Sequence, residues 1–165
     1  EGRLVIILGI DPGTAVTGYG VLNCEGNTPQ SIDFGCIRPP SKMHLHQRYL
    51  VINESIEHLI EKYQPDAFSI ETQYVHKNPQ GAIKLGMARG VSILAATKKN
   101  IPVFEYTPTK AKKSLVGTGR ASKEQVQYMV RKLLNLPDTP IPEDAADALC
   151  LAFCHYHNRN VTQPY

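Results

Sequence analysis

Four acidic residues of this sequence stand where a predicted strand ends or a predicted helix begins. Asp11 closes an apolar run and precedes Pro-Gly, and Glu71 closes a second, shorter apolar stretch. Asp144 and Asp147 are three residues apart, so they share one face in the first turn of the last predicted helix. An isolated charge at a buried strand end is costly, and such a group normally becomes neutral, pairs or binds a metal ion.

Carboxylates that share one site repel each other strongly unless divalent cations lie between them. Oxygen ligands without Cys or His beside them select Mg²⁺ or Mn²⁺. Each acid also has a structural explanation: Asp144 can favour the positive end of its helix, Asp11 can form an Asx turn, and Glu71 can be an exposed strand end. The position of all four acids beside a basic region favours a shared metal site.

The elements that would bring these acids together form a mixed α/β sheet. Apolar runs, periodicity and capping signals predict strands at 4–10, 17–23, 31–38, 67–72 and 101–106, and helices at 45–63, 79–99, 109–116, 123–135 and 142–156. The first three strands have short connections, which indicates an antiparallel meander, and strands and helices then alternate. In such a sheet the first and fourth strands can be neighbours. We expect a single domain over residues 1–165.

Local signals add detail to this arrangement. Ser122 and Gln125 form a capping-box pattern at the start of a helix. Gly13 and Gly18 have no side chains, which lets backbone or nucleic acid approach closely. Gly86 and Gly90 are four residues apart on one helix and allow a second helix to approach. Packing on the sheet and contact with a second copy explain this pair equally well.

Composition and charge narrow the function. The chain is 42% hydrophobic and 20% charged, as in soluble globular proteins, and no apolar run is long enough for a signal segment or a membrane span. From Lys77 to Lys132 it carries twelve Lys and Arg against Glu105 and Glu124, a net charge of +10, whereas the rest carries −7. This segregation favours a polyanionic partner, with a solvated lysine-rich surface as the alternative.

Two further patterns have ordinary explanations. The stretch CLAFCHYH, which contains Cys150 and Cys154, has zinc-ligand residue types, but its cysteines lie in an apolar helical stripe without a second ligand cluster. We expect all four cysteines to be reduced. The stretch DPGT…TGYG resembles the phosphate-binding turn of actin-like ATPases, which need two such domains, and 165 residues cannot provide them.

Five stretches together resemble the RuvC family of Holliday-junction resolvases: ILGIDPGTAVTGYGV, IETQYVHKN, KLGMARGV, PVFEYTPTKAKKSLVG and DAADAL. They occur in the family's order and cover nearly the whole chain. The resemblance implies a ribonuclease-H-like fold in which a five-stranded mixed sheet, an antiparallel meander followed by parallel strands, is flanked by helices. It also implies a homodimer that cuts four-way DNA junctions with Mg²⁺, two ions per active site, for which Mn²⁺ can substitute.

The resemblance assigns roles to individual residues. The family's acidic tetrad, which is catalytic and binds the metal, falls on Asp11, Glu71, Asp144 and Asp147, and its catalytic lysines fall on Lys112 and Lys123. Tyr74 stands where the family often has Phe and is expected to stack on junction bases. Lys77 and Arg120 are further expected DNA contacts.

Two alternative functions stay open on the sequence alone. One is a related nuclease that processes structured RNA, and the other is a catalytically silent junction-binding module. For the leading function we expect products with a 5′-phosphate and a 3′-hydroxyl and a cytoplasmic location in a bacterium. A branch-migration motor complex is a further partner that the resemblance leaves open, and no membrane association is expected.

Overall fold

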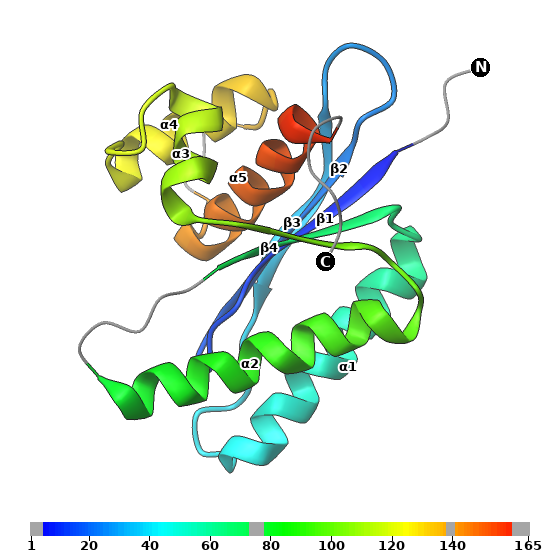
Figure 1. The fold of residues 1–165 in the computed structure, drawn as a ribbon, viewed down its shortest axis with the longest axis vertical. Helices are drawn as coiled ribbons and strands as arrows, with labels where there is room; N and C mark the ends of the chain where they lie inside the picture. The colour runs from blue at the N-terminus through cyan, green and yellow to red at the C-terminus, as the bar shows by residue number, and fades with distance from the viewer. Residues whose placement is uncertain (1–4, 73–77, 138–140, 160–165) are drawn as a thin grey trace.

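A five-stranded mixed sheet runs through the molecule between two layers of helices (Figure 1). The computed structural model describes residues 5–72, 78–137 and 141–159. Its strands are β1 (Ile6–Asp11), β2 (Thr17–Asn23), β3 (Gln30–Ile37), β4 (Ala67–Glu71) and β5 (Val103–Tyr106). They lie in the order β3-β2-β1-β4-β5, with β1–β2 and β2–β3 antiparallel and β1–β4 and β4–β5 parallel. This confirms the predicted meander followed by parallel strands.

The helices divide between the two faces of the sheet. One face is covered by α1 (Leu45–Tyr63) and α2 (Pro79–Lys98). The other is covered by α3 (Pro108–Val116), α4 (Lys123–Leu133) and α5 (Glu143–Asn158), which lie together in the upper part of Figure 1. No helix among the described residues is both long enough and apolar enough to cross a membrane.

Alternating side chains of β1 reach both hydrophobic cores. Leu8 and Ile10 pack with the α1 residues Ile52 and Ile56, whereas Ile7 points to the opposite face and packs with Leu149 of α5. Period-two alternation of this kind buries a strand on both faces. Because β1 is the central strand and is covered on both sides, its C-terminal residue, Asp11, has little freedom to move.

Helix α5 lies very close to the sheet because glycines face it. A Cβ added to Gly9 would lie 2.1 Å from the carbonyl oxygen of Ala148, and one added to Gly18 would lie 1.9 Å from that of Asp144. Backbone of α5 therefore rests directly on β1 and β2. The predicted close approach at Gly18 is confirmed, and its partner is the backbone of α5.

Element ends differ from the prediction by a few residues. The fifth strand starts at Val103 because the Ile101 N–H donates to the Ala96 carbonyl at the end of α2 and Pro102 has no N–H. The last helix starts at Glu143, since Pro142 has an extended backbone (ψ 137°) and contributes only its carbonyl, to the N–H of Ala146.

Other sequence signals have the expected structure. The capping box between Ser122 and Gln125 is confirmed at the start of α4, with both reciprocal hydrogen bonds present. The four cysteines are free, and Cys24, Cys150 and Cys154 are buried while Cys36 is half-buried. The Cys150 thiol donates to the Ala111 carbonyl at 3.3 Å, as expected for a cysteine of the core.

Candidate active site

Parallel pairing of β1 and β4 brings two carboxylates to one edge of the sheet. Asp11 is the last residue of β1 and Glu71 is the last residue of β4, and these strands pair from Ile7↔Ala67 to Ile10↔Ile70. Asp11 is buried, Glu71 is half-buried, and their side chains share a hydrogen bond. Two carboxyl groups form such a bond when a proton lies between them.

Two contacts hold the N-terminal half of α5 over this edge. Asp11 is paired with Gly18 of β2, and the Asp144 carbonyl lies against the bare Cα of Gly18. One turn beyond Asp147, the Leu151 carbonyl accepts a 2.8 Å hydrogen bond from the buried Ser69 hydroxyl of β4. The first turns of α5 are therefore fixed to β4 and to β2, the strand whose Gly18 pairs with Asp11 of β1.

The electrostatics show that these acids lie close together. Burial, together with the nearby Glu71, Asp147 and Asp144 carboxylates, raises the pKa of Asp11 to about 9. Burial also raises the pKa of Glu71, against the opposing effects of the Asp11 hydrogen bond and the Lys112 ammonium.

The helix carboxylate closest to this pair is perturbed in the same way. Burial, together with the charges of Glu71, Glu143 and Asp144, raises the pKa of Asp147 to about 6. A group of acids whose proton affinities are raised by burial and by one another needs positive charge. These mutual effects agree with the convergence of the tetrad, which stays a prediction.

The donor set fits hard divalent cations. All four groups offer carboxylate oxygens, the ligands that Mg²⁺ and Mn²⁺ prefer. In the part of the chain that the structure describes, no three His, Cys, Asp or Glu side chains are already arranged as a coordination shell. Asp11 and Glu71 bond to each other at the centre of this donor set.

One of the two predicted catalytic lysines lines a small cavity next to the carboxylates. Lys112 of α3 borders a space of about 130 Å³ together with Glu71 and Asp147, and its charge lowers the pKa of both acids. Thr107 caps α3 by accepting the Lys110 N–H at 3.1 Å, which sets the phase of the helix.

The second lysine is held by an acid that the sequence analysis did not single out. Lys123, at the start of α4, forms a 2.5 Å ion pair with Glu143, and this contact raises the lysine pKa. Asp147 and Asp144 act on Lys123 in the same direction, so its ammonium lies near the tetrad. The adjacency of Glu143 to Asp144 in the sequence was the available signal.

The predicted DNA contacts are only partly described. Tyr74 and Lys77 lie outside the described residues. Arg120 is exposed in the turn between α3 and α4, and Lys110 and Lys113 of α3 are exposed as well. Lys110 and Lys113 line a different hollow from the one that Lys112 borders, next to His157 and Asn158 at the end of α5.

The mixed sheet with this strand order, and acids at the ends of its central strands, defines the class of ribonuclease-H-like proteins. Residues 7–155 match the family model described as Crossover junction endodeoxyribonuclease RuvC. The chain therefore belongs to the RuvC family of crossover junction endodeoxyribonucleases.

Individual relatives agree over almost the full length. The crossover junction endodeoxyribonuclease RuvC of Protochlamydia amoebophila is 62% identical over 151 residues, which cover 92% of this chain and 90% of that protein. The Thermus thermophilus RuvC structure superimposes with a TM-score of 0.87 at 30% identity, covering 98% of this chain and all of that one. The same protein in complex with a Holliday junction substrate gives a TM-score of 0.89, with 98% and 99% covered at 30% identity.

Proposed function

We propose that this chain resolves four-way DNA junctions by hydrolysing phosphodiester bonds at the site formed by Asp11, Glu71, Asp144 and Asp147. The observation that carries the proposal is the mutual perturbation of these acids at the end of β1 and β4, because clustered, desolvated carboxylates are a costly arrangement without a cation-binding role. Membership of the RuvC family and the junction complex of the Thermus thermophilus relative support the choice of substrate.

The four carboxylates are the groups that would hold Mg²⁺, two ions per site, with Mn²⁺ as a substitute. When bound, such ions supply a hydroxide nucleophile near neutral pH and stabilise the leaving oxygen. The chain's own contribution is to present the Asp11 and Glu71 oxygens at the end of two adjacent strands, and Asp11, whose pKa is raised, gives up its proton when it binds a cation. Metal binding therefore releases protons.

The two lysines contribute positive charge around the scissile phosphate. Lys112 lies in the cavity beside Glu71 and Asp147, where its ammonium can stabilise the charge that builds up on phosphate oxygens in the transition state. Lys123 is more exposed and reaches the site only if it exchanges Glu143 for phosphate. Lys112 is therefore the lysine that we assign to the reacting group, and Lys123 approaches from the rim.

Symmetric cleavage of a four-way junction needs two active sites, and we infer a homodimer through α2. Ile83, Met87 and Leu94 on this helix are 50–64% exposed and lie on one stripe with Gly86 and Gly90. Apart from the adjacent residues and the nearby backbone of α2 itself, no atom of the described residues lies within 4 Å of a Cβ built on either glycine. An apolar stripe with two bare backbone positions suits a helix of a second copy, as a two-fold contact requires.

Three contacts complete the proposal. Tyr74, Lys77 and Arg120 bind the junction, Tyr74 by stacking on bases that unstack at the crossover.

A branch-migration motor is a further partner, which co-purification with the assembled junction complex can test. Because the proposed substrate is DNA, we expect the enzyme to act in the cytoplasm of a bacterium.

The decisive experiment replaces one carboxylate and keeps its shape. Asp11→Asn should lower the single-turnover cleavage rate of a four-way DNA junction by at least about a thousandfold, because the variant loses an anionic ligand of the metal. Junction affinity should stay the same or increase, since removing negative charge near phosphates does not weaken their attraction. The control is Glu54→Gln on the exposed side of α1, which should cleave at the wild-type rate.

The same assay separates the alternatives. Linear duplex and structured RNA are incubated beside the junction, each with and without Mg²⁺. Faster cleavage of RNA would replace the junction by an RNA substrate, and binding without cleavage at any metal concentration would define a silent binding module. Parallel loss of binding and cleavage in Asp11→Asn would show that Asp11 is structural.

A further inference from the structure

The guanidinium of Arg89, on the inner side of α2, contacts the ends of the two parallel strands that finish at the active site. Its Nε donates to the backbone carbonyl of Glu71 at 3.1 Å, and its terminal nitrogen forms an ion pair with Glu105 of β5. Both side chains are mostly buried, with 22% and 21% of their surface exposed. Neither residue has a role in the function proposed above.

The backbone of Glu71 needs such a contact because it is the last residue of β4. Its register with β1 has already ended at Ile70, and on the other side the following N–H, of Thr72, donates to Tyr106 of β5. The carbonyl of Glu71 points toward α2 and is satisfied by Arg89. The guanidinium thus bonds to the backbone of the residue whose side chain lies in the tetrad.

The effect of Arg89 on Glu71 is geometric and not electrostatic, because the charge of Arg89 is already paired with that of Glu105. The groups that shift the pKa of Glu71 are its burial, Asp11 and Lys112, whereas the charge of Arg89 is paired with Glu105. A planar guanidinium can hold two acceptors in a fixed relation, which a lysine ammonium on a flexible stem does less well. The contact therefore sets the separation between the end of β4 and the adjacent residue of β5.

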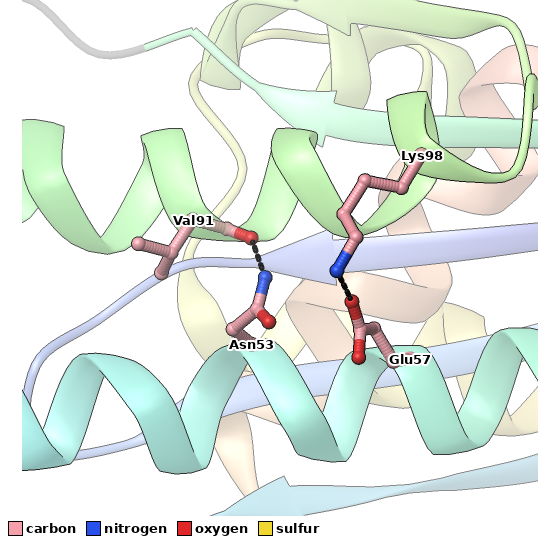
Figure 2. Close-up of polar contacts among 4 residues, drawn as sticks. All are labelled: Asn53, Glu57, Val91 and Lys98. Carbon is pink, nitrogen blue, oxygen red and sulfur yellow. Dashed lines mark hydrogen bonds and ion pairs between the residues drawn. The ribbon is translucent and has the colours of Figure 1, made fainter.

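The helix that carries Arg89 is itself anchored on both sides of it. From α1, the Tyr49 hydroxyl donates to the Lys84 carbonyl at 3.2 Å and the Asn53 amide donates to the Val91 carbonyl at 2.8 Å. Figure 2 shows the second of these contacts. Side chains that bond to backbone carbonyls of a neighbouring helix restrict its sliding and rotation, so the origin of the Arg89 side chain is well defined.

We propose that Arg89, together with Glu105, is a positioning residue that places the Glu71 carboxylate for metal binding. The inference rests on the metal role proposed for Glu71. It predicts that loss of the guanidinium weakens metal binding and cleavage without weakening junction binding. Groups that orient a metal ligand typically contribute 10–100-fold to metal affinity or activity.

The test compares Arg89→Gln, Arg89→Lys and Glu105→Gln with the wild type. Mn²⁺ binding to the protein without DNA is measured by titration calorimetry, beside the single-turnover cleavage rate and the junction Kd. Arg89→Gln should weaken Mn²⁺ binding by about tenfold or more and slow cleavage by 10–100-fold, with the junction Kd within about twofold. Arg89→Lys and Glu105→Gln, which each keep part of the contact, should lie between.

The matched control is Lys98→Gln on the same helix. Lys98 forms a 2.7 Å ion pair with Glu57 of α1, which Figure 2 also shows, and it is exposed and distant in sequence from the site residues. This variant should bind Mn²⁺ and cleave like the wild type. Equal losses in Lys98→Gln and Arg89→Gln would mean that any disturbance of α2 matters, and would overturn the specific role of Arg89.

A double variant separates this inference from the function on which it rests. If Glu71→Gln abolishes cleavage while Arg89→Gln leaves Mn²⁺ affinity unchanged, the role of Arg89 is wrong and the proposed function stands. If Glu71→Gln cleaves normally, the metal role of Glu71 is wrong. In the Glu71→Gln background, Arg89→Gln should cause no further loss of Mn²⁺ affinity, because the group that it positions is no longer a ligand. Should Arg89→Gln fail to fold, Glu105→Gln provides the same comparison.

Discussion

Helices α5 and α2 cover opposite faces of the same sheet, and they are buried to very different extents. In α5, ten of sixteen residues are buried, from Ala145 to His155, and the helix rests on bare glycine backbone. In α2, four of twenty residues are buried, and Ile83, Met87 and Leu94 remain exposed. The chain thus completes the packing of the helix that carries its carboxylates but leaves the outer side of α2 without a partner.

This difference separates two requirements of the proposed enzyme. The metal site needs rigid ligands, which α5 obtains from complete burial against β1 and β2. Symmetric action on a junction needs a second copy, and an exposed apolar stripe provides a surface for it. The comparison predicts that substitutions on α5 act on the fold and the chemistry, whereas substitutions on the outer side of α2 act on association.

The largest effect on association is expected for Met87→Glu. A charge in the middle of the apolar stripe would be buried without a partner in a dimer, which should weaken self-association by about a hundredfold or more. Sedimentation over a range of concentrations measures the dimer Kd. Because Met87 is half exposed in the monomer, the substitution should change the unfolding free energy of the monomer itself only slightly. A variant that remains dimeric would place the interface elsewhere.

Gly9→Ala tests the α5 side of the comparison. The added methyl would lie 2.1 Å from the Ala148 carbonyl oxygen and 3.0 Å from the Ala152 nitrogen, so backbone must move. Overpacking of this kind costs about 1–3 kcal/mol, and the unfolding free energy should fall by at least that amount. Denaturant unfolding at fixed protein concentration gives the value. If stability is unchanged, α5 is not held as closely as the structure shows.

The sequence predicted the parts of this arrangement that depend on local pattern. The ends of β1 and β4 were recognisable because an acid follows an apolar run, and the capping of α4 by Ser122 is a contact within four residues. The ion pair between Arg89 and Glu105 was not predictable from the sequence. It joins helix α2 to strand β5, and neither residue belongs to a recognisable sequence motif. Glu143 was missed for the same reason, because its partner Lys123 is on another helix.

The first histidine of the stretch CLAFCHYH has a structural role that the spacing of Cys and His does not predict. His155 lies in the core, where its Nδ1 and the Tyr106 hydroxyl form a 2.6 Å hydrogen bond and its ring packs on Phe104 at a centroid distance of 4.0 Å. Neither role could be seen in the spacing of Cys and His. Both depend on β5 lying next to α5, which only the fold establishes.

Burial of His155 makes the α5 core sensitive to acid. Desolvation lowers its pKa to about 4 from 6.5, with a smaller contribution from Arg159, so the unfolded chain takes up a proton that the folded chain excludes. The stabilisation is complete above pH 6.5 and is lost as the pH falls toward 4, by about 1.4 kcal/mol per pH unit. Denaturant unfolding between pH 4 and 7 measures this slope.

The control for this prediction is His155→Gln, which has no titrating ring. Raised pKa values of Asp11 and Asp147 act in the opposite direction, because folded carboxyls that bind protons more strongly favour the folded state at low pH. The difference between the wild-type and variant profiles cancels these shared contributions. If the difference in unfolding free energy between the wild type and His155→Gln does not change between pH 4 and 6.5, His155 is not neutral and buried in the folded chain.

Gly90→Ala is expected to have the smallest effect on stability, and it contrasts directly with Gly9→Ala because both add one methyl group to a glycine. Apart from the adjacent residues and the nearby backbone of α2, a Cβ on Gly90 meets no atom of the described residues within 4 Å. Alanine is favoured over glycine inside a helix by about 0.5–1 kcal/mol. In the Met87→Glu background, where association is weak, Gly90→Ala should therefore stabilise the monomer by that amount. In the otherwise wild-type chain the same methyl should weaken the dimer, since it lies on the stripe where a second helix approaches. Stabilisation in both backgrounds, with an unchanged dimer Kd, would show that no helix of a second copy passes close to Gly90.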